Sequence, residues 1–298
     1  MGEEHARRIP TELEIKILQH IADEDEADHS CWSALVQCAL VCKAWTEHVR
    51  RHLYYAINMN KLRGALQFNS LRQYAHLRCF VRDFVWPQTR SAWSLYCFTA
   101  SDANDAGIIK EIAPSVMRLR FRRVNHWPLK EPLIEVISTF ANITELDMVG
   151  TLWQSWTTAI RMISIFPALT TLAMPDVDYC QEDDPKVSYP PPIHLTNIKL
   201  AMGCETETVN WICMGSPIPS IQTVETRSQI DLNAVARLLR SLGGSLRHLV
   251  IHIDSESAFL PMSLVAKALF LLIILSRSRR GYPRRRRILL SPHRKHYP

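Results

Sequence analysis

Hydrophobic residues in the middle of the chain recur in a fixed pattern: an apolar residue, two variable residues, a second apolar residue, one variable residue and a third apolar residue. Copies start at residues 116, 143, 169, 195, 221 and 246, so neighbouring copies lie 25 to 27 residues apart. Each copy predicts a short strand with one buried face. The copies are Val116-Leu119-Phe121, Ile143-Leu146-Met148, Leu169-Leu172-Met174, Leu195-Ile198-Leu200, Ile221-Val224-Thr226 and Leu246-Leu249-Ile251, with a less regular one at Val81-Phe84-Trp86.

Helical patterns lie between these predicted strands. Apolar residues at helical spacing predict helices over residues 132–140, 156–166 and 231–242. Asp231 stands where an N-cap is expected, and Gly243-Gly244 stands where the last of these helices should stop. The acidic, proline-rich stretch over 176–194 is expected to be a solvated loop.

The alternation of strand and helix resembles the leucine-rich repeat, whose period is about 20 to 29 residues. One such repeat cannot bury its own apolar face, so the resemblance implies a curved solenoid with strands on its concave side. The Asn or Cys expected after the last apolar position is replaced, so the repeats resemble the irregular kind. Those positions hold Val124, Thr151, Val177, Gly203 and Asp254. The alternative is a non-repeating α/β domain.

The first fifty residues carry a separate apolar signal. Thr11 and Glu14 form a capping box after Pro10, which predicts a helix continuing to about residue 22. An acidic break follows, and then a second long helix, or two short helices broken near Lys43. In both segments the apolar residues spread over a wider arc than one core-facing stripe needs. Either the first helix is buried between two layers of its own domain, or it keeps an apolar face for a partner.

Particular residues of this segment resemble the F-box, a motif of about fifty residues that packs three helices, in the form common among fungal proteins. They are Ile9-Pro10, Glu12-Leu13, Ile17-Leu18, the run over 40–45, and Arg51-His52-Leu53-Tyr54. The resemblance implies binding to a Skp-family linker and, through it, to a cullin and a RING subunit. The linker contacts that it implies are Pro10, Leu13, Ile17, Leu18, Leu40, Val41 and Trp45. Ile17 and Trp45 could instead hold the three helices together.

The expected fold class is α + α/β, a three-helix F-box followed by an irregular leucine-rich-repeat-like α/β solenoid. The expected segments are a disordered amino terminus (1–8), the F-box (9–57), a connecting helical segment (58–110), the repeat domain (111–254), and an apolar helix with a basic disordered tail (255–298). The expected function is substrate recognition in an SCF-type ubiquitin ligase, without catalysis by this chain. Candidate contacts to an unknown protein substrate are Trp127, Trp153, Trp156 and Trp211, although a buried position in the core is the default expectation for each.

Composition and charge bear on which kinds of partner the chain could bind. The net charge of +6 divides into +9 over residues 255–298 (10 Lys and Arg, one Glu) and −3 over residues 1–254 (25 Lys and Arg, 28 Asp and Glu). The basic tail supports an alternative function, a repeat scaffold that binds nucleic acid or an anionic membrane. Its apolar run is too short for a membrane span. The preferred interpretation of the tail is a helix that packs on the last repeat, followed by a disordered basic end, so we expect neither nucleic acid nor a membrane as partner.

The sequence lacks the residue patterns that usually mark several kinds of site. The eight cysteines include no CxxC pair and no signal peptide precedes them, so we expect free thiols, no metal, and a cytoplasmic or nuclear location. The glycine loops that hold nucleotides and the local motifs of hydrolases are absent from the sequence, so we expect no cofactor and no catalytic residue.

Overall fold

The structure is a computed structural model of the 298-residue chain. It describes residues 13, 16–17, 29–41, 43–86, 103–127, 131–181, 189–200, 205–227, 232–254 and 287–293. Within these residues no helix is long and apolar enough to cross a membrane.

The fold is built on one large parallel sheet whose strands follow one another in chain order. Every neighbouring pair is parallel, and β12 adds a ninth strand beside β11. The strands are β1 (Ala56–Asn58), β2 (Asp83–Trp86), β3 (Arg118–Arg122), β5 (Glu145–Val149), β7 (Thr171–Met174), β9 (Asn197–Leu200), β10 (Thr223–Arg227), β11 (His248–Asp254) and β12 (Arg287–His293). The predicted α/β class with a parallel sheet and interleaved helices is confirmed.

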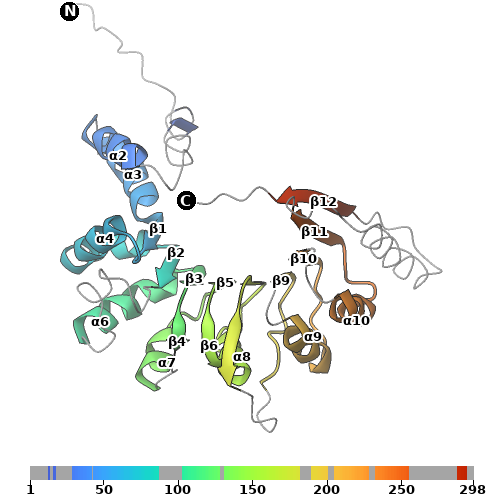
Figure 1. Ribbon diagram of the computed structural model, residues 1–298. Coiled ribbons are helices and arrows are strands. Elements are labelled where there is room, and N and C mark those ends of the chain that lie inside the picture. Colours follow the sequence, from blue (N-terminus) through green and yellow to red (C-terminus); the bar gives the residue numbers. More distant parts are fainter. Residues whose placement is uncertain are drawn as a thin grey trace, which may run out of the picture.

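Helices connect the strands and lie along the outer side of the curved sheet (Figure 1). They are α4 (Leu62–Gln73), α6 (Ala103–Ile112), α7 (Glu131–Ser138), α8 (Trp156–Ser164), α9 (Glu205–Met214) and α10 (Leu232–Leu242), with short 3₁₀ helices η1 (Ala75–Phe80) and η2 (Ala113–Ser115). The three helices predicted over 132–140, 156–166 and 231–242 correspond to α7, α8 and α10. Gly243 has a φ of +51°, so it ends α10 in the left-handed conformation expected of a helix stop.

The second apolar position of each sequence copy forms a continuous row across the sheet. Strand register places each of these residues opposite its counterpart in the next strand, and all of them are buried. The row is Ile57, Phe84, Leu119, Leu146, Leu172, Ile198, Val224 and Leu249. Each advance of 25 to 27 residues along the sequence therefore brings an apolar side chain to the same level of one shared hydrophobic core.

The sheet begins further toward the amino terminus than the predicted start of the repeats at residue 111. Tyr54, Ile57 and Met59 form another copy of the apolar pattern, and the less regular copy at Val81 leads into β2. The segment over 58–110, assigned as a connecting helical segment, thus contains β2 at the less regular copy as well as α4 and α6. This copy lies outside the predicted repeat domain because its spacing to the next copy is longer than the others.

A ladder of threonines joins successive repeats at the edge where the strands begin. Thr170 donates through Oγ1 to the carbonyl oxygen of Thr144 at 3.0 Å, and Thr196 donates in the same way to Thr170 at 3.2 Å. Each of these carbonyls also accepts the two backbone N–H groups that open the next strand. The ladder fixes the register at the start of each strand.

A second, three-stranded parallel sheet occupies the place where the sequence lacked the expected Asn or Cys. It consists of β4 (Asn125–Trp127), β6 (Leu152–Ser155) and β8 (Asp178–Gln181). Val124, Thr151 and Val177 precede its strands and are buried. The backbone pairing of this sheet supplies the hydrogen bonds that a buried Asn would otherwise make. The stretch expected to be loop from residue 176 therefore begins with a strand, and 182–188 lie outside the described residues.

Part of the predicted basic tail is also a strand. Residues 287–293 form β12, because the free edge of β11 offers unpaired backbone N–H and C=O groups. Residues 1–8, 255–286 and 294–298 lie outside the described residues, so the predicted apolar helix and disordered ends are not tested.

Candidate functional site

The amino-terminal helices α2 (His29–Val41) and α3 (Lys43–Tyr55) pack against each other ahead of the sheet (Figure 1). Their own small core consists of Leu35, Val49 and Leu53, with Trp45 half-buried against it. The Thr46 hydroxyl donates to the Ala39 carbonyl at 2.9 Å and so ties α3 to α2. The second of the two predicted alternatives, two helices broken near Lys43, is the one observed.

Apolar side chains outside this core are open to solvent. Leu40 at the end of α2 is 76% exposed, Leu13 is 51% exposed and Ile17 is 42% exposed. Leu13, Lys16 and Ile17 are helical, as predicted for that segment. Water-exposed leucine and isoleucine are ordinary singly; here two of them, Leu13 and Ile17, lie one helical turn apart and the third, Leu40, lies at the end of α2, so each is available to a partner.

The structure separates the predicted linker contacts into groups. Leu13, Ile17 and Leu40 are exposed, whereas Trp45 packs between α2 and α3 and therefore supports the helices. The side chain of Val41 is not described, and Pro10 and Leu18 lie outside the described residues.

The tryptophans chosen as substrate contacts belong mostly to the core. Trp153, Trp156 and Trp211 are at most 8% exposed. Trp153 donates Nε1–H to Thr151 at 3.0 Å, and Trp211 donates to the Tyr189 carbonyl at 2.6 Å. These three side chains are closed to a partner in this structure, and the rings of Trp153 and Trp211 also have hydrogen-bond partners within the protein. The side chain of Trp127 on β4 is not described.

Charged residues instead gather on the inner face of the large sheet, the face turned away from the helices. They alternate with the buried apolar row along each strand, as side chains on successive strand residues must. This charged inner face comprises Asp83, Arg118, Arg120, Arg122, Glu145, Asp147, Lys199 and Glu225. The sequence signal for it was the charge at the variable positions of each copy.

A buried ion pair anchors this face. Arg120 donates from Nε to Asp83 Oδ1 at 2.8 Å and from Nη2 to Oδ2 at 2.5 Å. Both residues are buried, at 8% and 3% exposed. This two-pronged geometry satisfies both oxygens of the carboxylate with one planar guanidinium.

The neighbouring charges on this face are paired as well. Arg118 donates to Glu145 on the adjacent strand, and Lys199 Nζ lies 2.8 Å from Glu225 Oε2. Partial burial opposes the charged form of Arg118, but the hydrogen bond and charge of Glu145 outweigh it and raise the pKa of Arg118.

Among the described residues of this face, Asp147, like Arg122 at its Nε, keeps a buried polar atom without a hydrogen bond. Its Oδ1 is buried and accepts no hydrogen bond within the described part of the chain. Burial raises the pKa of Asp147 above its ordinary value, although the charges of Arg122, Arg120 and Lys199 oppose the shift. Two of the cations near Asp147 are already paired with other acids, Arg120 with Asp83 and Lys199 with Glu225.

The described residues show no arrangement for metal binding, since no three His, Cys, Asp or Glu side chains among them are grouped to hold an ion. Cys38, Cys79, Cys180 and Cys213 are free thiols. The arginine run of the tail, on which the alternative function depends, lies outside the described residues up to Arg286.

Comparisons with known proteins give no family for this chain. No protein-family model matches the sequence, and no curated protein matches it significantly.

Proposed function

We propose that this chain is the substrate-recognition subunit of an SCF-type cullin–RING ubiquitin ligase. The amino-terminal helices act as an F-box that binds a Skp-family linker. The large sheet and its helices form an irregular leucine-rich-repeat-like solenoid that binds a protein substrate. The chain itself performs no chemistry.

The exposed apolar side chains of Leu13, Ile17 and Leu40 carry this proposal. Leu40 is 76% exposed, whereas Leu35 on the same helix is buried in the core between α2 and α3. Burying one leucine fully contributes about 1.5–3 kcal/mol, so leaving this one in water is a cost that a bound partner would recover. These exposed residues are ones for which the F-box resemblance implies linker contact.

The periodicity of the sheet supports the solenoid assignment. In a solenoid each repeat contacts its sequence neighbours, and here strands β1 to β11 of the large sheet pair in chain order. Arg123 and Asp176 have positive φ, as Gly150 does, and all three occupy the same turn in successive repeats. Equivalent turns, rows and ladders in successive repeats are what stacked copies of one unit would give.

The mechanism that follows is proximity. A substrate held on the repeat domain shares one complex with the ubiquitin-charged enzyme bound to the RING subunit. Its acceptor lysines then react at a raised effective concentration. The protein's contribution is binding and orientation.

Capture of a recombinant Skp-family linker by the full-length chain tests the proposal. We expect the wild type to bind and Leu40→Asp or Leu13→Asp to weaken binding about 10- to 100-fold, since each loses roughly 1.5–3 kcal/mol of apolar burial. Met214→Asp is the matched control, because Met214 is 80% exposed on α9 and lies away from the amino-terminal helices.

The contradicting results are equally specific. Failure of the folded wild type to bind the linker would refute the F-box proposal, as would equal binding by wild type and Leu40→Asp. If the wild type then binds nucleic acid or anionic vesicles instead, the scaffold alternative takes its place.

A further inference from the structure

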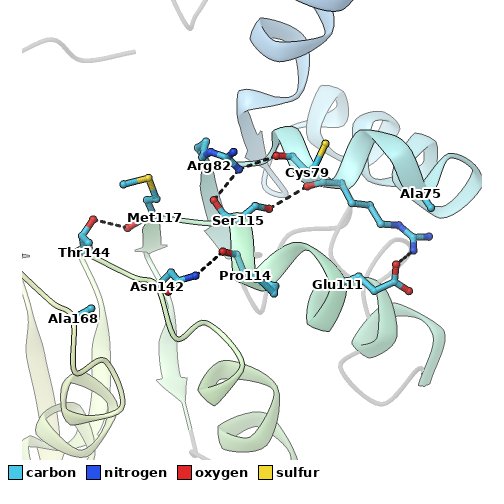
Figure 2. Close-up of a pocket in the computed structure, with 11 residues that line it drawn as sticks. Ala75, Cys79, Arg82, Glu111, Pro114, Ser115, Met117, Asn142, Thr144 and Ala168 are labelled. Atoms are coloured by element: carbon cyan, nitrogen blue, oxygen red, sulfur yellow. Dashed lines mark hydrogen bonds and ion pairs between the residues drawn. The ribbon is translucent and has the colours of Figure 1, made fainter.

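A cavity of about 850 Å³ opens at the edge of the large sheet where strands β2, β3 and β5 begin (Figure 2). Its walls come from η1, η2 and the turns that lead into β3 and β5. This volume lies within the range of sites that hold small molecules or the end of a polypeptide. None of the residues proposed to bind the linker lines this cavity, and the inference drawn from it is independent of the proposed function.

Arg82 is fixed in the wall of this cavity by one of its terminal nitrogens. Nη1 donates to the carbonyl oxygens of Cys79 at 2.8 Å, Val81 at 3.2 Å and Ser115 at 3.0 Å. Figure 2 shows two of these bonds, which join η1 and η2 through the guanidinium. The plane of the guanidinium is therefore set before any ligand arrives.

The other edge of this guanidinium is left open. Among the described residues, neither Nε nor Nη2 of Arg82 makes a hydrogen bond, and no carboxylate pairs with it. Nε and Nη2 together form the edge that grips a carboxylate with two parallel N–H···O bonds. Arg82 thus presents an unused two-pronged donor whose orientation is already held.

The other charges around the cavity cancel. Arg78 pairs with Glu111 and also donates from Nε to the Leu71 carbonyl at 2.9 Å. With Arg78, Arg82 and Glu111 as the charged lining residues, the cavity carries a net charge of +1. A singly charged carboxylate balances that charge, whereas a doubly charged phosphate would leave an excess negative charge beside Glu111.

The neutral polar groups of the lining are largely used within the wall. Asn142 donates Nδ2–H to the Pro114 carbonyl at 2.7 Å, and Ser115 Oγ donates to the Ile112 carbonyl at 2.8 Å (Figure 2 shows the first). What remains is apolar: Met117 is 50% exposed, and Ala75 and Ala168 complete the lining.

We propose that this cavity binds a carboxylate attached to an apolar group, with the carboxylate on Nε and Nη2 of Arg82 and the apolar group against Met117. The carboxyl-terminal residue of a polypeptide has this chemistry, and so does a free hydrophobic acid. In both cases the ligand supplies the counterion that Arg82 lacks.

The test measures binding of three probes to the full-length chain by titration calorimetry. The probes are acetylated tripeptides ending in Leu or Phe with a free carboxylate, the same peptides with a carboxamide end, and acetyl-phenylalanine as a free acid. We expect the acids to bind and amidation to weaken binding at least tenfold. Binding of the peptide acid alone identifies a polypeptide end as the source, and equal binding of acetyl-phenylalanine identifies a small acid.

Two variants test whether the ligand binds at Arg82. Arg82→Lys should weaken acid binding at least tenfold, since lysine lacks the fork. Because Arg82 also joins η1 to η2, the second variant leaves it intact: Met117→Glu puts a like charge beside the carboxylate and should weaken binding similarly, while Met214→Glu should not. Equal binding of acid and amide, no binding of either acid at millimolar concentration, or full binding by Met117→Glu would overturn the proposal.

Discussion

The buried pair of Asp83 and Arg120 gives the sharpest prediction about stability. Asp83→Asn keeps the size of the side chain but removes its charge, so the guanidinium of Arg120, which is 8% exposed, loses the carboxylate that accepts its two hydrogen bonds. The two hydrogen bonds of 2.8 and 2.5 Å lose their ionic character, and one of them loses its acceptor.

The expected loss follows from burial. Removing one partner of a buried ion pair costs about 3–5 kcal/mol, whereas an exposed pair contributes about 0–1 kcal/mol. For a domain of this size each kcal/mol shifts Tm by roughly 2–4 °C, so Asp83→Asn should lower Tm by about 6–20 °C. Glu145→Gln is the matched control, because it breaks a pair with Arg118 whose side chains are 41% and 43% exposed.

The assay is thermal and urea unfolding of the full-length chain, followed by circular dichroism. Replacing both partners with apolar residues, Asp83→Leu with Arg120→Met, should be less destabilising than Asp83→Asn, because neither charge of this pair then remains buried. If Asp83→Asn lowers the free energy of unfolding no more than Glu145→Gln does, the buried position of the Asp83–Arg120 pair does not add the stability predicted for it.

Three further variants test other parts of the fold. Gly64→Ala would place a methyl carbon 1.9 Å from a main-chain oxygen and should cost about 3 kcal/mol or more, while Gly107→Ala, with nothing within 4 Å, should stabilise its helix by about 0.5–1 kcal/mol; equal urea midpoints would contradict this. Thr170→Val removes one rung of the threonine ladder and should cost about 0.5–1.5 kcal/mol, and Thr170→Ser should restore most of it. Burial raises the pKa of Asp147 above 3.8, so the native state holds this proton more firmly than the unfolded state. The free energy of unfolding should therefore fall as pH rises through the unfolded value toward the native one, from about pH 4 upward, and Asp147→Asn should remove that fall and be at least as stable at pH 7; a less stable variant at pH 7 would refute the assignment.

The sequence predicted the large sheet because one physical requirement repeats in it. Each strand must place an apolar side chain at the same depth of a shared core, and Leu119, Leu146 and Leu172 show this at equal register. Three of the helices between the strands, α7, α8 and α10, were predicted for the same reason, since each has one apolar face that meets this core.

The small sheet β4, β6 and β8 left no comparable signal. Its strands are only three or four residues long. They are joined by hydrogen bonds between backbone groups, which almost any sequence can make, so no side-chain pattern marks them. The left-handed residue before it is Arg123 in one repeat and Asp176 in another, so glycine did not mark the turn. The threonine ladder was visible as Thr144, Thr170 and Thr196, each directly after an apolar position of the pattern.

The candidate sites were only partly accessible from sequence. The size and chemistry of tryptophan suit a substrate contact, yet Trp153 and Trp211 are buried, and their ring N–H groups donate to Thr151 and to the Tyr189 carbonyl. The open edge of Arg82 depends on three carbonyl oxygens from different turns, a geometry that no linear pattern records.

Site-specific photocrosslinking tests the central claim most directly. A photoreactive residue replaces Leu40, which is 76% exposed on α2, or Leu66, which is 53% exposed on α4, and each full-length protein is irradiated with a recombinant Skp-family linker. The account predicts a covalent adduct with the linker from position 40 and none from position 66. Absence of an adduct from position 40, or equal adducts from both positions, would contradict it.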